Sequence, residues 1–352
     1  MSLSKIVLLV ISGLIVLCTG LSQNPTRYTL KRPDNFPPFI QNNAENLTKE
    51  GVLLGRSLFY DTILSRDFSI SCASCHKPEN AFSDSGEISS KGVSGKRQRR
   101  NTPALFNLLW SDSFFWDGRV TSLESQAIEV VSGHTEMDLS WQEAVSRLSS
   151  DETYLSLFDQ AFPGREIDSL LVADALAQFQ STLISNNSKY DRVLRGEDHF
   201  TEEEYKGFVF VNDQSMGNCL HCHTTDAHAL GTNGGLANNG LPIIDSLDWG
   251  KYDVTSDEND LGLFKIPSLR NLVFTAPYMH DGRFSSLEEV LDFYSRGVES
   301  HVNLDAKMNY FTKNKPLFSE EEKHNILAFL MTLTDSTFVE NPLYRSASYQ
   351  VE

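Results

Sequence analysis

The stretch CASCH at residues 72–76 has a counterpart, CLHCH, at residues 219–223. In a Cys-x-x-Cys-His motif the two thiols add to the vinyl groups of a haem, and the adjacent histidine is held where its imidazole binds the iron. Zinc would need a compact set of four ligands, and a redox dithiol would not need the histidine in both motifs. Two covalently attached c-type haems are therefore predicted, on Cys72, Cys75 and His76 and on Cys219, Cys222 and His223.

Each motif follows the same kind of helical stretch, at residues 48–59 before the first motif and 201–211 before the second. Both stretches open on a threonine with glutamate close behind, which is an N-cap signal. Their apolar residues recur every three or four positions, as on one buried helix face. This internal duplication predicts two domains of the same design. Residues 185–189, rich in Asn and Ser, are the predicted linker.

The predicted fold is mainly α, with two cytochrome c-like domains that each carry one haem, long loops and few strands. Apolar periodicity adds helices at 122–131, 141–148, 169–183 and 319–333, whereas the long apolar alternation of strands is scarce. We expect an N-terminal haem domain at residues 23–188, a C-terminal haem domain at 189–340 and a tail at 341–352.

Residues 1–22 have the layout of a signal peptide, because Lys5 precedes the apolar run Ile6–Leu17 and small residues follow it. The run is shorter than the roughly 20 residues that a membrane span needs. The protein is therefore expected in the periplasm, either soluble or anchored by a lipid on Cys18. Both alternatives stay open, because Leu17 is a poor match for the small residue expected before a lipid-bearing cysteine.

The net charge of −17 over 352 residues disfavours nucleic acid as a partner. An acidic surface could attract a basic partner, such as a small electron-donating protein. A solvated acidic surface explains the charge more simply.

Two further regions resemble the bacterial di-haem cytochrome c peroxidases. The first contains NTP at 101–103, FWDGR at 115–119, QA at 126–127 and EM at 136–137, and the second contains IPSLRN at 266–271 and TAPYMHDG at 275–282. Order and spacing match as well as composition. The resemblance extends over roughly residues 46–335, which is nearly the whole mature chain.

The resemblance implies a division of labour between the haems. The first haem would reduce peroxide and the second would transfer electrons. Glu136 matches the catalytic acid and base of the family, spaced as expected from Gln126, and Trp116 matches the tryptophan between the haems. Further positions match residues that hold a calcium ion between the domains, largely through backbone carbonyls: Asn101, Thr275 and Pro277.

The chemistry of peroxide agrees with the role implied for Glu136. Peroxide reacts as its anion, so a base must take one proton. The O–O bond then breaks when the distal oxygen leaves as water, so an acid must return that proton, and one carboxyl group can do both. A surface carboxylate at Glu136 and a packed core indole at Trp116 are the alternatives.

The first departure from the family pattern concerns the first haem. Many members carry a histidine, some sixteen residues after the first motif, that closes the peroxide site at rest. This chain has no histidine from Lys77 to Gly133, and Gly92 stands near the expected place. The first iron is therefore expected to be open, with no prior reduction needed. His134 is either a second pocket residue or a hydrogen-bonded structural histidine.

The second departure concerns the sixth ligand of the second haem, where Tyr294 stands in place of the usual methionine. Tyrosine is an established axial ligand, and a phenolate favours higher oxidation states. Met279 and Met308 are competing ligands, and a core position is the simpler alternative for Tyr294. Both departures resemble MauG, a methylamine-utilisation relative that oxidises tryptophan residues on a partner protein.

The leading hypothesis is a di-haem cytochrome c peroxidase that reduces hydrogen peroxide to water with electrons from a small periplasmic donor, a cytochrome c or a cupredoxin. One alternative is a MauG-like high-valent di-haem oxidase that modifies a partner protein. The other is a non-catalytic di-haem electron carrier, which would need protein ligands on both faces of both irons. Family members often dimerise, so a homodimer is a further expectation.

Overall fold

The computed structural model describes residues 24–213, 219–224, 230–243, 248–314 and 318–346. The predicted signal peptide and Cys18 lie outside these residues. In the described ranges no helix is long and apolar enough to cross a membrane.

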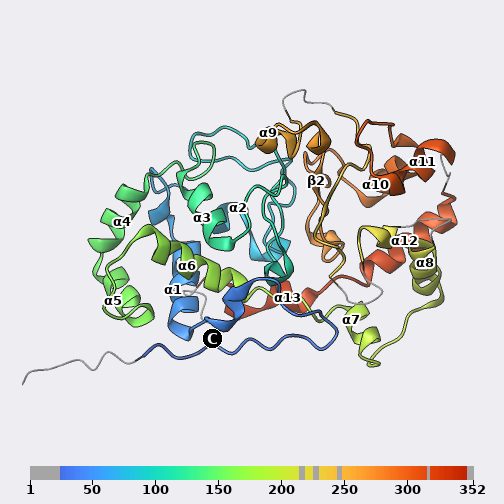
Figure 1. Cartoon of the computed structure of the whole chain (residues 1–352). Helices are drawn as coiled ribbons and strands as arrows, with labels where there is room; N and C mark the ends of the chain where they lie inside the picture. The colour runs from blue at the N-terminus through green and yellow to red at the C-terminus, as the bar shows by residue number, and fades with distance from the viewer. Residues whose placement is uncertain (1–23, 214–218, 225–229, 244–247, 315–317, 347–352) are drawn as a thin grey trace, which may run out of the picture.

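Helices dominate the described chain, as predicted (Figure 1). The α-helices are α1 (Lys49–Tyr60), α2 (Cys72–Cys75), α3 (Leu123–Ser132), α4 (Trp141–Ser149), α5 (Glu152–Ala161), α6 (Ser169–Ser181), α7 (Lys189–Leu194), α8 (Glu202–Asn212), α9 (Tyr252–Thr255), α10 (Leu287–Asp292), α11 (Asn309–Asn314), α12 (Glu320–Met331) and α13 (Ser336–Glu340). The strands β1 (Leu236–Ala237) and β2 (Phe264–Lys265) form one antiparallel pair. The helices expected before both motifs are confirmed, and Thr48 and Thr201 cap them through their side chains.

The two halves are built around equivalent helix pairs, α1 with α6 and α8 with α12, which lie on opposite sides of Figure 1. Each pair meets at a glycine. A Cβ on Gly55 would stand 1.8 Å from the Ala175 carbonyl oxygen, and a Cβ on Gly207 would stand 1.9 Å from that of Asn325. Only glycine permits so close an approach of two helices, so the duplication extends to the packing.

The two halves also share a second sequence repeat. Residues 102–124 align without a gap with residues 266–288, and both segments contain Asp-Gly-Arg and Ser-Leu-Glu. Asn107 and Asn271 occupy the same position in it and have left-handed backbones, with φ of 55° and 60°. The Asn107 N–H donates to the Leu183 carbonyl at 2.8 Å, and the Asn271 N–H donates to that of Leu333 at 3.2 Å. In each half, the repeated segment is therefore hydrogen-bonded to a residue just after the second helix of the pair, α6 or α12.

Each end of the described chain packs in the hydrophobic core of the opposite half. Phe338 of α13 packs with the first core, 5.8 Å from Phe82 between ring centroids. In the opposite direction, Phe36 of the N-terminal arm packs with the second core, 5.0 Å from Trp110. The predicted boundary at residue 340 therefore departs from the packing, because α13 buries its aromatic face in the first half.

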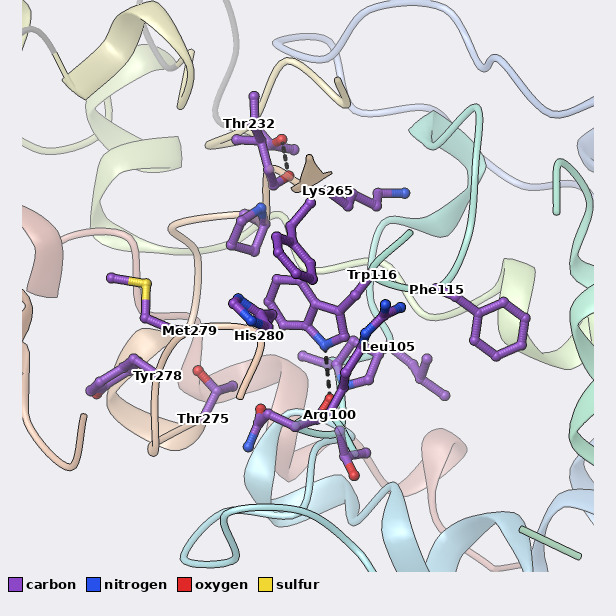
Figure 2. A pocket seen from close by; sticks show the side chains of 18 of the residues that line it. Arg100, Leu105, Phe115, Trp116, Thr232, Lys265, Thr275, Tyr278, Met279 and His280 are labelled. Carbon is purple, nitrogen blue, oxygen red and sulfur yellow. Dashed lines mark hydrogen bonds between the residues drawn. The ribbon is translucent and has the colours of Figure 1, made fainter. Parts of the chain in front are cut away.

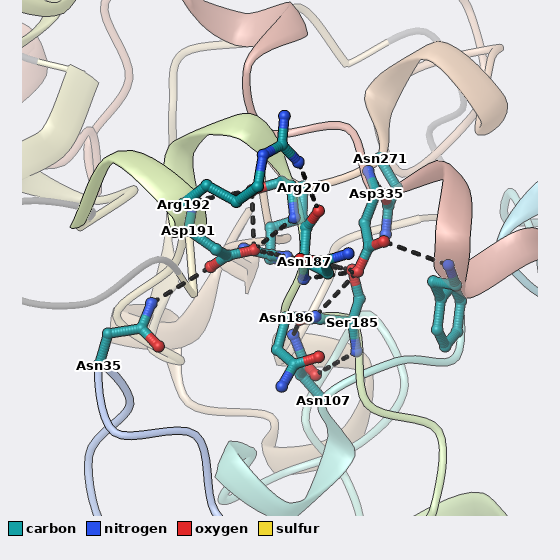
Figure 3. Close-up of polar contacts among 12 residues, drawn as sticks. Asn35, Asn107, Ser185, Asn186, Asn187, Asp191, Arg192, Arg270, Asn271 and Asp335 are labelled. Atoms are coloured by element: carbon teal, nitrogen blue, oxygen red, sulfur yellow. Dashed lines mark hydrogen bonds and ion pairs between the residues drawn. The ribbon is translucent and has the colours of Figure 1, made fainter. Parts of the chain in front are cut away.

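A buried ion pair fixes the connection between the halves (Figure 3). Arg270 is fully buried and donates to both Asp191 carboxylate oxygens, at 3.1 and 2.7 Å, and to Ser185 Oγ at 3.2 Å. The Asp335 carboxylate accepts from the Asn186 and Asn187 N–H groups, both at 2.9 Å. The predicted linker is thus a hydrogen-bonded part of the interior rather than a loose tether.

Candidate active site

One cavity of about 630 Å³ is lined by both Cys-x-x-Cys-His motifs. It extends between the halves, and Trp116 and His280 lie side by side within it (Figure 2). A mostly apolar cavity of this size is typical of a cofactor site.

The first motif is held by a short helix and the turn after it. Ser71 and Ser74 form a reciprocal cap on α2, and the His76 N–H donates to the Cys72 carbonyl oxygen at 2.9 Å. The His76 ring places Nδ1 2.8 Å from the Phe82 carbonyl oxygen. This bond orients the imidazole, assigns the proton to Nδ1 and leaves Nε2 as the nitrogen for a metal.

The second motif repeats this arrangement. The His223 N–H donates to the Cys219 carbonyl oxygen at 2.9 Å, and Nδ1 lies 2.9 Å from the Pro267 carbonyl oxygen. Burial lowers the pKa of both His76 and His223, so both rings are neutral at physiological pH. The two cysteine side chains of each motif line the cavity beside the histidine. Paired thiols beside an oriented imidazole, facing an apolar cavity, fit a covalently bound haem.

Glu136 lies in the loop after α3 and lines the cavity together with Gln126 and the first motif. Burial raises the pKa of Glu136 to about 7, while the nearby Arg119 charge opposes this shift and Glu129 adds to it. A carboxyl group with that pKa can both accept and release a proton near neutral pH. Gly133 lies close to this side chain, because a Cβ there would stand 2.7 Å from Glu136 Oε2.

Gly92, which stands where many family members have a histidine, packs against the same loop. The Val93 N–H donates to the Glu136 carbonyl oxygen at 2.9 Å. His134, considered as a second pocket residue, is 95% exposed, and its Nδ1 lies 2.7 Å from Asp138 Oδ1. The structural alternative for His134 therefore holds, because the loop turns its side chain to solvent. In the described part of the chain, the cavity-lining histidines are His76, His223 and His280.

Trp116 lines the cavity that both motifs share, and its Nε1–H donates to the Asn101 carbonyl oxygen at 2.8 Å (Figure 2). Its ring meets the His280 ring edge to face, with centroids 6.4 Å apart. His280 in turn stacks on Phe264 with centroids 3.6 Å apart. Trp116 and His280 are equivalent positions of the second repeat, so the two halves meet through matching residues.

Tyr294, Met279 and Met308 all line the cavity on the side of the second motif. Tyr294 lies in a five-residue π-helix, Phe293–Gly297, which continues α10. Asn239 donates to the Tyr294 hydroxyl oxygen at 3.2 Å and to Met279 Sδ at 3.8 Å. The two side chains are therefore close enough to compete for one position.

The residues implied in calcium binding all line the cavity, and one of them, Asn101, contacts Trp116. Asn101, Thr275 and Pro277 line the same cavity, and the Asn101 N–H donates to the His280 carbonyl oxygen at 2.7 Å. In the described ranges no group of three or more His, Cys, Asp or Glu residues could hold a metal ion. A cation at this position would depend on carbonyl oxygens, which calcium accepts as ligands.

A model of the di-haem cytochrome c peroxidase family matches residues 49–199. The methylamine utilization protein MauG of Methylophilus methylotrophus is 36% identical over 92% of this chain and 94% of its own length. This chain belongs to the di-haem cytochrome c peroxidase family. Cytochrome c551 peroxidase of Nitrosomonas europaea is 30% identical over 80% of this chain and 79% of its own. The crystal structure of a MauG-like protein associated with microbial copper homeostasis matches with a TM-score of 0.80 and 32% identity, covering 92% of this chain and 100% of that one.

As a di-haem cytochrome c peroxidase family member, the chain is an oxidoreductase whose cofactors are two c-type haems. The predicted fold class is confirmed by the structural match. Sequence reasoning missed His280, Phe264 and Asn239 as cavity residues. The gapless second repeat was the available signal for His280, because it aligns His280 with Trp116.

Proposed function

We propose that this family member reduces hydrogen peroxide to two waters, using two protons and two electrons from a small periplasmic donor, a cytochrome c or a cupredoxin. The observation that carries the proposal is the position of Glu136. Its carboxyl group, with a pKa of about 7, lines the same cavity as His76, and Gly92 adds no competing histidine side chain to that cavity.

Cys72, Cys75 and His76 would hold the first haem, which would supply an iron able to bind peroxide and exchange electrons with it. Glu136 would take one proton from peroxide and return it to the oxygen that leaves as water. Gln126 lines the same cavity and would orient the peroxide. Exclusion of bulk water by the apolar lining strengthens these polar contacts.

Cys219, Cys222 and His223 would hold the second haem, and the Tyr294 oxygen would be a further ligand to its iron. Trp116 would link the two centres. Its Nε1–H donates to a backbone carbonyl, which is too weak a base to remove the proton, so the indole keeps that proton. These contacts support a site that passes electrons between the halves.

The remaining assignments follow from the family pattern. We propose a calcium ion between the halves at Asn101, Thr275 and Pro277, and export to the periplasm by residues 1–22. A lipid on Cys18 and a homodimer are further parts of this proposal.

Peroxide turnover of the as-isolated protein, with a reduced small cytochrome as donor, tests the function. Glu136→Gln should lower kcat/KM for peroxide by about 10²- to 10⁴-fold, the usual range for a lost general acid–base. Glu152→Gln, an exposed glutamate at the start of α5, is the matched control and should keep the rate. An unchanged rate in Glu136→Gln would refute the acid–base role.

A MauG-like oxidase that modifies a partner protein is the second candidate, and the tyrosine at position 294 together with the relatives named MauG favours it. Mass spectrometry of a co-purified protein after peroxide addition separates the two candidates. Oxidised tryptophan in the partner, without turnover of a cytochrome donor, would favour the oxidase. A plain electron carrier is disfavoured by the first site, where the described histidines offer no second axial ligand.

A further inference from the structure

Asn239 contacts both candidate sixth ligands of the second haem. It follows β1, and its Nδ2 lies 3.2 Å from the Tyr294 hydroxyl oxygen and 3.8 Å from Met279 Sδ.

The hydrogen bonds settle which end of the Asn239 amide faces Tyr294. The Leu241 N–H donates to Asn239 Oδ1 at 3.1 Å, so the oxygen end is already used by the backbone. The end that faces Tyr294 is therefore the NH₂ group, which only donates. The Tyr294 oxygen accepts this bond and keeps a lone pair for a metal.

The loop that carries Asn239 is tied to the segment that follows Tyr294. The Gly240 N–H donates to Asn238 Oδ1 at 2.8 Å, and the Glu299 N–H donates to the Gly240 carbonyl oxygen at 2.9 Å. Gly240 has φ of +75°, and a Cβ there would stand 2.7 Å from the Glu299 carbonyl oxygen. Asn239 and the π-helix with Tyr294 therefore form one unit with a set spacing.

The π-helix gives Tyr294 its direction. A π-helix widens one turn by a residue, and such turns are frequent at functional sites. Phe293 and Phe311 flank the Tyr294 ring, with centroids 4.9 and 6.4 Å away. These aromatic contacts hold the ring while its oxygen faces the cavity.

We propose that Asn239 is a positioning residue that selects Tyr294 over Met279 as the sixth ligand of the second haem, by donating a hydrogen bond to the ligand oxygen. A hydrogen bond to an anionic oxygen is roughly twice as strong as one between neutral groups. A thioether sulfur is a weak acceptor and gains little from the same donor. The donor therefore stabilises the oxygen-ligated form. This inference rests on the proposed second haem.

Asn239→Asp is the sharpest test, because it keeps the Oδ1 that accepts from Leu241 but replaces the NH₂ donor with an acceptor. The ferric absorption spectrum and the reduction potential of the second haem are the readouts, and Tyr294→Phe identifies the tyrosinate-to-iron band. We expect Asn239→Asp to reduce the tyrosinate-ligated population at least tenfold, with a higher potential as Met279 takes the position. In an added Met279→Leu background the band should stay lost, and the rise in potential should be smaller.

Asn233→Asp is the matched control. Asn233 is exposed and forms the same kind of turn, with Oδ1 accepting from the Gly235 N–H at 2.9 Å. The substitution introduces the same negative charge as Asn239→Asp. This variant should keep the band and the potential. If Asn239→Asp fails to fold, Asn239→Leu provides the same readouts with a neutral side chain of similar size.

Three results would overturn the inference: a retained band in Asn239→Asp, an equal effect of Asn239→Asp on the potential in a Tyr294→Phe background, or an unchanged spectrum in Tyr294→Phe. None of these affects the loss of peroxide turnover expected for Glu136→Gln. A failure of the ligand assignment is therefore distinguishable from a failure of the proposed peroxidase function.

Discussion

The backbone of Gly92 lies directly against Thr135, so that a Cβ on Gly92 would stand 2.0 Å from the Thr135 carbonyl oxygen. The loop that carries Glu136 can lie in this position only because residue 92 has no side chain. Gly92, which stands near the place where many family members are expected to carry a histidine, therefore makes room for the loop with Glu136.

Gly92→Ala should therefore displace the loop and lower peroxide turnover at least tenfold, with a loss of about 1–3 kcal/mol of stability from overpacking. Steady-state kinetics and chemical denaturation measure the two effects. Gly95→Ala is the control, because Gly95 has a left-handed backbone but open space around its Cβ. It should lose some stability and keep its turnover. Normal turnover in Gly92→Ala would show that this packing does not position Glu136.

The pKa of Glu136 sets the expected pH dependence of peroxide reduction. Burial raises this pKa to about 7, and only the deprotonated carboxylate can take a proton from peroxide. The value of kcat/KM should therefore rise tenfold per pH unit below pH 7 and level off above it. In Glu136→Gln this rise should disappear, whereas a control at Glu152 should retain it. A profile that is identical in Glu136→Gln would assign the titration to another group.

The same shift in pKa predicts an effect on stability. Because the pKa of Glu136 is raised from 4.5 to about 7, the folded protein holds a proton that the unfolded chain has released between these pH values. The free energy of unfolding should therefore fall as the pH rises through this window. Denaturation of the haem-loaded protein at pH 5 and pH 8 checks this, and Glu136→Gln should show a smaller difference between the two.

Trp116 should matter for electron transfer rather than for folding. Trp116→Phe removes the indole and its bond to the Asn101 carbonyl oxygen, so electron transfer between the centres should slow at least tenfold in stopped-flow experiments with prereduced protein. Trp141→Phe is matched to it, because the Trp141 Nε1–H also donates to a backbone carbonyl, at 3.2 Å, and Trp141 does not line the cavity. Equal rates in both variants would exclude Trp116 from the route.

The ion pair of Arg270 with Asp191 should dominate the stability of the junction. Both side chains are fully buried, so Arg270→Met leaves an unpaired carboxylate in the interior, at a cost of about 3–5 kcal/mol. Adding Asp191→Asn should recover part of this loss, because the second variant removes the unpaired charge. Urea denaturation gives both values. If the double variant recovers no stability, the loss comes from the broken hydrogen-bond network of Arg270 rather than from the unpaired charge of Asp191.

The sequence predicted the elements whose signals are local. The caps at Thr48 and Thr201 fixed the starts of α1 and α8, and the motif spacing fixed where each imidazole lies relative to its thiols. These features depend on neighbouring residues, so they can be recognised without knowledge of the tertiary fold.

The features that the sequence did not predict depend on contacts between distant segments. Phe36 and Phe338 each pack in the other half of the molecule, and no local pattern says which core an aromatic residue will join. The solvent-facing direction of His134 follows from the tight loop around Gly133. The contact between Asn239 and Tyr294 needs a loop and a π-helix that are 55 positions apart in the sequence.

The electron paramagnetic resonance spectrum of the ferric, as-isolated protein is the most direct test of the division between the two haems. We expect a high-spin signal from the haem at His76 and a low-spin signal of equal intensity from the haem at His223. Two low-spin signals, with both irons saturated by side chains, would contradict a peroxide site that is open at rest.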